Sequence, residues 1–478
     1  MRTTYRRPSI NKRLIPVIVI SAILLLSALA IIAVLASGIL YKRIPISKPQ
    51  VSISEGISEV VADSPLDAED MLDRTKKVLA DNRGSSPFIV SWYLLPGNIA
   101  TQTESMSEYL LARDQILLLR AYIACDRKEE ANVLLTAIDT TFRGQDGLLL
   151  DFLRTADQVD DDTTIGPEPT EMTRDIYRTA SVTNASGEPN EESSGTLPMT
   201  TVIAEPVSSY SDTLSFVGAL LLYYDKWGTS SDMERIREYA DTLYVENLAS
   251  LADLRVPAPT PTPAPTQVII DNPDLANGII DEEIVSFIPL SSLDLTSLQM
   301  LSSIDSRFES LYTKATDILV ASQISDEIPL PAEGYDPQTG GYLYVSDRTS
   351  SFRLDRSVLA LLYMSETQAI SPDATSWLKE QLLNQRMLYS LYDVITGNAT
   401  SEIVAMDAYP LAFSVGVLED DLSLCAAALV PMEQALATNS KSDVKGMLFR
   451  SVLSSRVAVY ARENLLAIIA LSSLPETR

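Results

Sequence analysis

The chain contains no histidine among its 478 residues. Histidine is the usual base of serine and cysteine triads and the commonest protein ligand for metals, so its absence argues against both kinds of site. Acid–base chemistry must then fall to carboxylates, tyrosine or lysine. Two cysteines, Cys125 and Cys425, are too few for a disulfide scaffold, and they either form one bridge or remain two buried thiols. We expect no cofactor and no metal.

Charge is distributed unevenly along the chain. The first 48 residues hold eight of the 37 basic residues and no acid, which leaves 29 basic residues against all 64 acidic ones in the remainder. Such a field repels nucleic acids and other anionic polymers, so a nucleic-acid partner is excluded and a neutral or cationic partner is favoured.

Residues 14–41 form an apolar run without an ionisable charge apart from Tyr41, and a basic leader at 1–13 precedes it. As a helix the run would be about 42 Å long, longer than the ~30 Å hydrocarbon core of a membrane. A cleaved signal peptide is the alternative, although its apolar region usually has only ~7 to 15 residues. The sequence predicts an uncleaved signal anchor with a cytoplasmic leader and a C-terminal body outside the cell membrane.

The body that follows is predicted to be a single domain over 65–478, joined to the anchor by a stalk at 42–64 rich in Ser, Pro and Glu. Polar inserts are expected near 155–205 and 257–297. The second insert opens with PAPTPTPAPT at 257–266, which cannot be helical and is expected to be extended. Short linkers between separate domains are the alternative.

Helical periodicity dominates the rest of the chain. Residues 110–123 are apolar almost all round, as in an enclosed helix, whereas 231–250 is polar on one side. Enclosed and half-exposed helices in alternation indicate two concentric layers, and the sequence therefore predicts an all-α fold, an (α/α)6 barrel. The predicted helices lie near 65–82, 103–124, 127–142, 212–227, 231–250, 298–323, 351–367, 373–391, 402–417, 420–437 and 452–473.

Five segments carry a family resemblance. They are TQTESMSEYLL at 101–111, DGLLLDFL at 146–153, SDTLSFVGALLLYYDKWG at 211–228, SSFRLDRSVLALLYMS at 350–365 and VYARENLLAIIAL at 459–471. In this order they resemble the motifs of glycoside hydrolase family 8, which contains endoglucanases, chitosanases and xylanases and has an (α/α)6 barrel. The resemblance implies a divergent member of that family.

By this resemblance, Glu104 occupies the position of the general acid that protonates the leaving glycosidic oxygen. A carboxyl at the mouth of an apolar barrel has its pKa raised by desolvation, as such an acid requires. The alternative is that Glu104 lies at a helix N-terminus and interacts favourably with the helix dipole, with Thr101 or Thr103 as the cap. Glu108 shares its helical face and replaces a tyrosine of the family, while Tyr109 is displaced by one position.

Asp355 matches the proposed base of the family, which activates the attacking water. The family has an arginine three positions later, whereas here Arg356 is adjacent and Val358 takes that place. Asp355 could instead cap a helix or pair with a neighbouring arginine. Asp212 is similar to the family aspartate that contacts the distorted sugar, although the alignment is one residue out of step, and a helix N-cap is the alternative.

Sugar-binding sites use aromatic rings as platforms. Trp92 and Tyr93, just before the acid motif, are the best candidates, and further tyrosines could complete the site. We expect Glu108, Tyr109, Asp212 and Arg356 to bind the substrate as well. The family tryptophan of the second motif falls on Asp151. This thin aromatic lining leaves two functions open. One is a membrane-anchored, inverting glycoside hydrolase that cleaves a β-linked polysaccharide or exopolysaccharide, and the other is a catalytically impaired barrel that binds a glycan or a partner during polysaccharide secretion.

Overall fold

The computed structural model describes residues 25, 27, 43–48, 54–81, 86–96, 105–107, 109–154, 206–245, 254–257, 284–344, 350–452 and 456–474. The predicted anchor at 14–41 therefore lies outside the described residues except for Leu25 and Ser27. None of the helices in the described part of the chain has the length and apolar character needed to cross a membrane. The insert at 155–205 and most of the 257–297 insert also lie outside.

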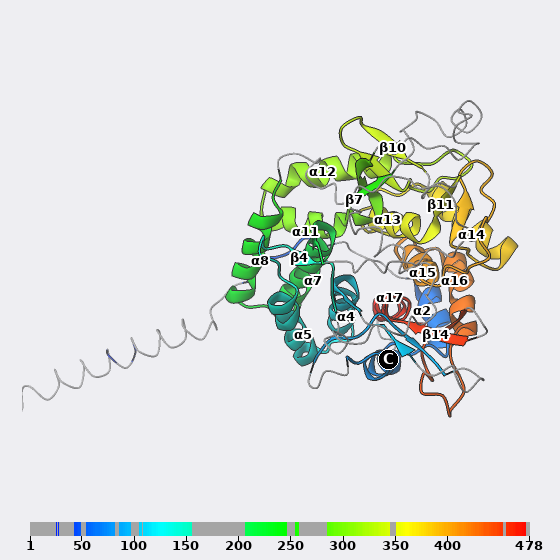
Figure 1. Cartoon of the computed structure of the whole chain (residues 1–478), viewed down its shortest axis with the longest axis horizontal. Coiled ribbons are helices and arrows are strands. Elements are labelled where there is room, and N and C mark those ends of the chain that lie inside the picture. Colours follow the sequence, from blue (N-terminus) through cyan, green and yellow to red (C-terminus); the bar gives the residue numbers. More distant parts are fainter. Residues whose placement is uncertain are drawn as a thin grey trace, which may run out of the picture.

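Six inner helices contact one another in a closed ring, in chain order, and the last returns to the first. Figure 1 shows this ring around the centre of the molecule. Its members are α4 (Ala112–Ala124), α7 (Tyr210–Trp227), α11 (Leu295–Ile304), α13 (Leu354–Glu366), α15 (Ala408–Leu418) and α17 (Ala461–Ser472).

A second set of helices packs against the outside of this ring. Its members are α3 (Ala68–Val78), α5 (Lys128–Thr141), α8 (Ser230–Leu243), α12 (Arg307–Val320), α14 (Pro372–Gln385) and α16 (Leu422–Gln434). Burial separates the two sets, because nine of the eleven residues of α15 are buried, but only three of the eleven in α3. The fold is thus mostly helical, and the two rings agree with the predicted (α/α)6 barrel.

The connections differ at the two ends of the ring. Each of the first five inner helices passes to the next outer helix through a short turn, at 125–127, 228–229, 305–306, 367–371 and 419–421. We call this side the short-turn end. The return connections from outer to inner helices are much longer, at 79–111, 142–209, 244–294, 321–353, 386–407 and 435–460. They enter the inner helices at their N-termini, and we call this side the long-connection end.

Every strand of the described residues lies in a long connection, and all pairings are antiparallel. One four-stranded sheet has the order β13 (Arg450–Val452), β14 (Arg456–Tyr460), β1 (Trp92–Leu94), β2 (Ser105–Met106), and the other has β10 (Gly341–Leu343), β9 (Gly334–Asp336), β8 (Ile284–Pro289), β7 (Leu254–Pro257). The two-stranded pairs are β11 (Ser351–Arg353) with β12 (Leu391–Asp393), β3 (Tyr109–Leu111) with β5 (Phe152–Arg154), and β4 (Leu149–Leu150) with β6 (Ser208–Ser209).

These strands shorten several predicted helices. The helix predicted from 103 begins at Ala112, because β2 and β3 precede it, and the helix predicted from 452 begins at Ala461, after β14. The helix predicted over 298–323 is two helices, α11 and α12, which separate at 305–306. The second insert also ends earlier than predicted, because β8, the 3₁₀ turn η2 (Leu290–Ser292) and the start of α11 fall within its range.

The predicted stalk packs against the body in its described parts. Nε and Nη1 of Arg43 donate to backbone carbonyls at the C-terminus of α7, Ile46 is buried, and the Ser47 amide donates to Oγ of Ser303 in α11. Further on, α2 (Glu55–Ala62) packs against α16, with Ile57 fully buried. Residues 43–62 therefore reach both sides of the short-turn end, and we call their described parts the N-terminal strap.

Candidate functional site

Four inner helices bring buried carboxylates to the long-connection end. Asp114, Asp355 and Glu463 lie in the first turns of α4, α13 and α17, and Asp407 immediately precedes α15. The first three helices follow directly from a strand and have no side-chain N-cap. The positive end of the helix dipole favours negative charge at these positions.

Asp355 is held by the arginine that precedes its helix. Nε of Arg353 donates to Oδ1 at 3.1 Å, and Nη2 donates to Oδ2 at 3.3 Å. Burial by itself raises the pKa of Asp355, but the charges of Arg353 and Arg462 outweigh this and hold the pKa well below its ordinary value. Asp355 is therefore ionised, which is the state that a general base requires.

Glu333, in the connection just before β9, contacts both arginines that flank Asp355. It accepts a hydrogen bond from the Arg353 amide, and its Oε2 lies 3.4 Å from Nη1 of Arg356. Only 3% of the Glu333 side chain is exposed, and burial raises its pKa. Arg356, predicted to bind substrate, is thus anchored beside Asp355 through a residue that the sequence analysis did not identify.

Asp407 and Glu463 complete the cluster. Nε of Arg462 donates to Oδ2 of Asp407 at 3.0 Å, and Nε of Arg450 lies 3.3 Å from Oε1 of Glu463. Burial raises the pKa of Asp407, and the charge of Asp355 raises it further. Burial also raises the pKa of Glu463 to about 7.

Asp114 is buried with only part of its hydrogen-bonding capacity used. It is 2% exposed, and its Oδ1 has no hydrogen-bond partner. Burial raises its pKa, whereas the charge of Arg113 acts in the opposite direction. The cluster thus combines an ionised carboxylate, Asp355, with neighbours whose pKa values are raised, and such a separation is how a site obtains both a base and an acid.

The sequence-predicted acid, Glu104, and its neighbour Glu108 lie outside the described residues. Ser105 and Met106, which follow Glu104, are described, and they pair with Leu94 and Tyr93 in one sheet. The helix α4 begins at Ala112.

The other predicted residues have more varied positions. Trp92 is half-buried beside Tyr460, whereas Tyr93 is buried in the main core, so its ring is not an open platform. Tyr109 packs edge-on against Phe152, with ring centroids 5.3 Å apart. Asp212 lies in the first turn of α7, but the N-cap is Ser209, whose Oγ accepts from the Asp212 amide, so the N-cap alternative for Asp212 is wrong.

A second polar cluster lies deeper in the ring. Nη2 of Arg120 in α4 donates to Oδ2 of Asp294 at 2.8 Å, and Asp294 caps α11 by accepting from Ser297. Glu366, at the end of α13, accepts a hydrogen bond from Oγ1 of Thr296. Burial, with the added charge of Asp294, raises the pKa of Glu366 to about 7.

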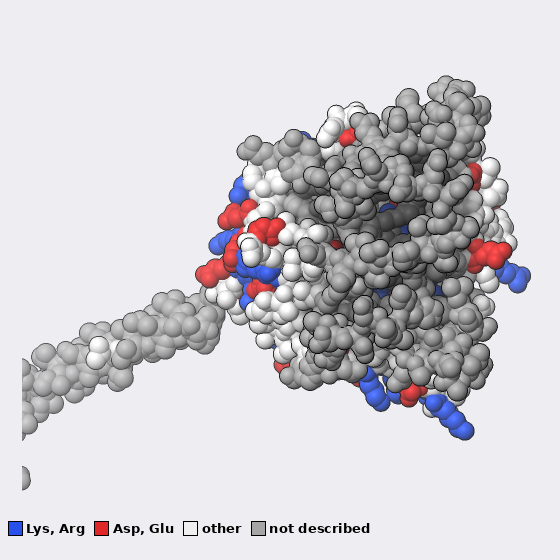
Figure 2. Space-filling model, in the orientation of Figure 1, with Lys and Arg blue, Asp and Glu red and all other residues white. Residues whose placement is uncertain are grey.

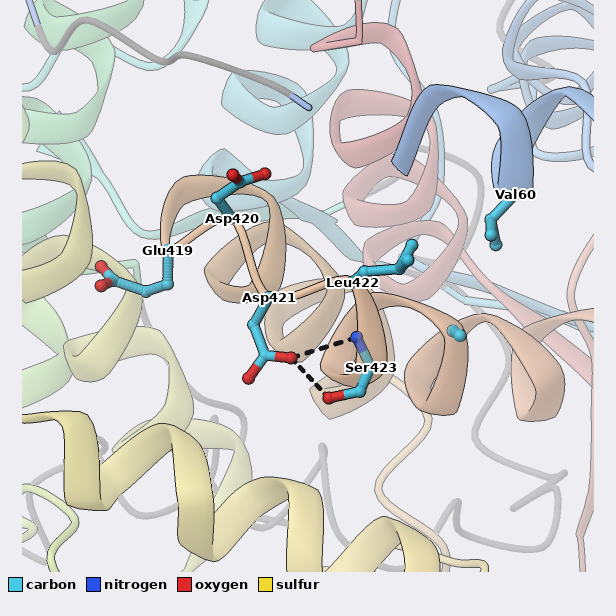
Figure 3. Close-up of a pocket in the computed structure, with 7 residues that line it drawn as sticks. Val60, Glu419, Asp420, Asp421, Leu422 and Ser423 are labelled. Atoms are coloured by element: carbon cyan, nitrogen blue, oxygen red, sulfur yellow. Dashed lines mark hydrogen bonds between the residues drawn. The ribbon is translucent and has the colours of Figure 1, made fainter. Parts of the chain in front are cut away.

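A shallow depression at the start of α16 is a separate surface feature (Figure 3). It is lined by Val60, Glu419, Asp420, Asp421, Leu422, Ser423 and Ala426. The Asp421 carboxylate caps α16 through the amides of Ser423 and Leu424 and also binds Lys379. The eleven residues of α15 separate this turn from Asp407, so the two places are roughly 16 Å apart along the ring axis. The depression therefore belongs to the short-turn end and not to the carboxylate cluster.

Both cysteines are free: Cys425 is buried against α15, and Cys125 shares a hydrogen bond with Ser472. Within the described ranges, no group of three acidic or cysteine side chains is placed to hold a metal ion.

Comparisons with known proteins concern the fold. No protein-family model matches the chain, and no curated protein matches it in sequence. A solved structure described as a novel alpha-amylase from Clostridium perfringens has a TM-score of 0.60 and 19% identity, over 86% of this chain and 99% of that chain. This likeness shows a shared fold.

Family 8 glycoside hydrolases are also among the solved structures that match. An endoglucanase from Klebsiella pneumoniae has a TM-score of 0.47 and 11% identity, over 84% of this chain and 98% of its own. A xylanase from Teredinibacter turnerae, solved as a catalytic mutant with xylohexaose, has a TM-score of 0.49 and 10% identity, over 88% and 95%. The family named by these structures is the one that the sequence resembles.

Proposed function

We propose that the protein is an inverting glycoside hydrolase that acts on a β-linked polysaccharide, with Glu104 as the general acid and Asp355 as the general base. The observation that carries the proposal is the carboxylate cluster at the N-termini of four inner helices, in which Asp355 is ionised and its neighbours have raised pKa values. Asp355 also stands where the family motif has its base. The matching polysaccharide-hydrolase folds support the same class of reaction.

The mechanism needs two opposed carboxyls. Glu104 would protonate the glycosidic oxygen as the bond breaks, while Asp355 takes a proton from a water that attacks the anomeric carbon from the opposite face. In an inverting enzyme the two carboxyls are about 6.5 to 9.5 Å apart, to leave room for that water. The charges of Arg353 and Arg462 keep Asp355 ionised but also make it a weaker base. We therefore expect one of these contacts to loosen when substrate binds.

Reducing-end release by the full-length protein in detergent micelles tests this function. The panel contains β-linked glucan, xylan, chitosan and a uronate polymer, and it includes starch because one matching structure is described as an alpha-amylase. Proton NMR of the first product decides between inversion and retention. Binding without hydrolysis of any polymer would favour the alternative function, a barrel that binds a glycan or a partner during polysaccharide secretion.

We also propose that residues 14–41 anchor the protein in the cell membrane, with the helical body outside. The apolar run and its basic leader support this arrangement. Protease added to intact cells, or to spheroplasts if there is an outer membrane, should remove the body. Protection there, together with cleavage in inverted vesicles, would reverse the proposed orientation.

A further inference from the structure

The ion pairs of the carboxylate cluster turn their basic member toward the surface. In the Arg356–Glu333 pair the side chains are 24% and 3% exposed, and in the Arg450–Glu463 pair they are 23% and 2% exposed. Arg353 and Arg462 are also more exposed than their partners, by smaller margins. In each of these pairs the arginine side chain is therefore more accessible to solvent than the carboxylate that it neutralises.

Several ion pairs at the short-turn end have the opposite arrangement. Arg127 is 29% exposed and its partner Asp73 is 63% exposed, and Lys226 is 37% exposed against 73% for Asp126. In these pairs the acid is the more exposed member, whereas in the pairs of the carboxylate cluster it is the arginine.

Helix N-termini give a physical reason for this difference. Asp355 and Glu463 lie in the first turns of α13 and α17, where the positive end of the helix dipole favours a buried negative charge beside the arginines. Arg462 donates to Asp407 through Nε, and its Nη1 and Nη2 atoms have no hydrogen-bond partner among the described residues. In Figure 2, some Lys or Arg atoms are visible near the centre of the face toward the viewer.

We propose that Arg353, Arg356, Arg450 and Arg462, here called the arginine floor, bind the anionic substituents of an acidic glycan. A guanidinium presents several donors in a plane that matches the oxygens of a carboxylate or sulfate. This inference names the substrate class of the hydrolase proposed above and rests on that site. It also revises the expectation of a neutral or cationic partner, because net charge acts at long range and is screened beyond about 8 Å at physiological salt.

Calorimetry tests the inference by measuring the affinity of the full-length protein, in detergent micelles, for matched oligosaccharides. A β-1,4-linked glucuronate hexamer and a cellohexaose differ only at C6 of each sugar, and a 6-O-sulfated cellohexaose tests whether sulfate can replace carboxylate. We expect at least one anionic hexamer to bind at least 10-fold more tightly than cellohexaose, with an affinity that falls as salt rises. Equal or tighter binding of cellohexaose, or no binding of either anionic hexamer, would overturn the proposal.

Variants then locate the binding. Arg356→Gln should lower the affinity for the tighter-binding anionic hexamer about 10-fold, and Arg356→Lys should lose less. Because Glu333 keeps its hydrogen bond from the Arg353 amide, the fold should survive, and circular dichroism checks this. Arg127→Gln is the matched control at the short-turn end and should bind normally. Unchanged binding by Arg356→Gln would refute the arginine floor, whereas tight binding without hydrolysis would refute only the proposed reaction.

Discussion

Turns of two to five residues close one end of the helical ring, whereas connections of 22 to 68 residues build the other. At the short-turn end the acidic side chains cap helices or form exposed pairs, as Asp421 does with α16 and Lys379. At the long-connection end they are buried, and oxygens of Asp114 and Glu463 have no hydrogen-bond partner. The comparison indicates that polar groups near the short turns stabilise the fold. Those at the other end are buried with shifted pKa values, as catalytic acids and bases often are.

Substitutions at the two ends should differ most in their effect on turnover. Glu104→Gln and Asp355→Asn should each lower turnover by about 10²-fold or more, the usual scale of acid–base catalysis. Asp421→Asn, at the short-turn end, should leave turnover unchanged. Steady-state rates of reducing-end release measure all three, and thermal unfolding checks each fold. Full activity of either carboxylate variant, or carboxyls beyond roughly 12 Å apart in a liganded structure, would contradict the assignment.

Stability should depend most on the pair inside the ring. Arg120→Met leaves Asp294, which is 1% exposed, without its cation, and losing one partner of a buried ion pair costs about 3 to 5 kcal/mol. Arg127→Met removes only exposed pairs and should cost less than about 1 kcal/mol. Denaturant unfolding compares the two variants. Similar losses would mean that the interior pair contributes no more than a surface one.

A pH dependence should follow from the carboxyls with raised pKa values. Glu366 and Glu463 have pKa values of about 7 in the fold, against 4.5 ordinarily. Between these values the folded state keeps protons that the unfolded state has released, so stability should fall as pH rises from about 4.5 to 7 and then level off. Glu366→Gln should reduce this fall, by on the order of 2 kcal/mol. Thermal unfolding at several pH values measures it, and Glu402→Gln, at an exposed position, is the control.

The smallest effect is expected at a helix cap. Asp421→Ala removes the acceptor for the first amides of α16 and the partner of Lys379, and such a loss costs about 0.5 to 2 kcal/mol. Turnover should stay normal. If this variant slowed hydrolysis as much as Asp355→Asn does, it would contradict the proposal that the short-turn end serves stability and the long-connection end serves catalysis.

Local sequence patterns were enough to predict the helices and their two layers. Apolar periodicity reports which face of a helix is enclosed, and short motifs located Asp355 at a helix start. The starts of α4 and α17 were predicted too early, because strands such as β14 continue an apolar pattern into the helix without a break. The stalk was predicted from its Ser, Pro and Glu content, which hides the two isoleucines, Ile46 and Ile57, that are buried.

Most of the carboxylate cluster and of the second polar cluster could not be predicted, because their members meet only in the folded chain. Arg462 and Asp407 are 55 residues apart, and Arg120 and Asp294 are 174 residues apart. Glu333 lies in a connection without a motif. Arg462 and Glu463 did fall within a recognised segment, VYARENLL, and two adjacent opposite charges inside an apolar helix are a signal that could have drawn attention to them.

The N-terminal strap fixes which end of the ring lies next to the predicted anchor segment in the chain. Arg43 is bound to carbonyls at the C-terminus of α7, so the strap begins at the short-turn end. The 18 residues of α7 place the opposite end about 27 Å away. Arg43, the first residue of the strap, and the carboxylate cluster therefore lie at opposite ends of the ring.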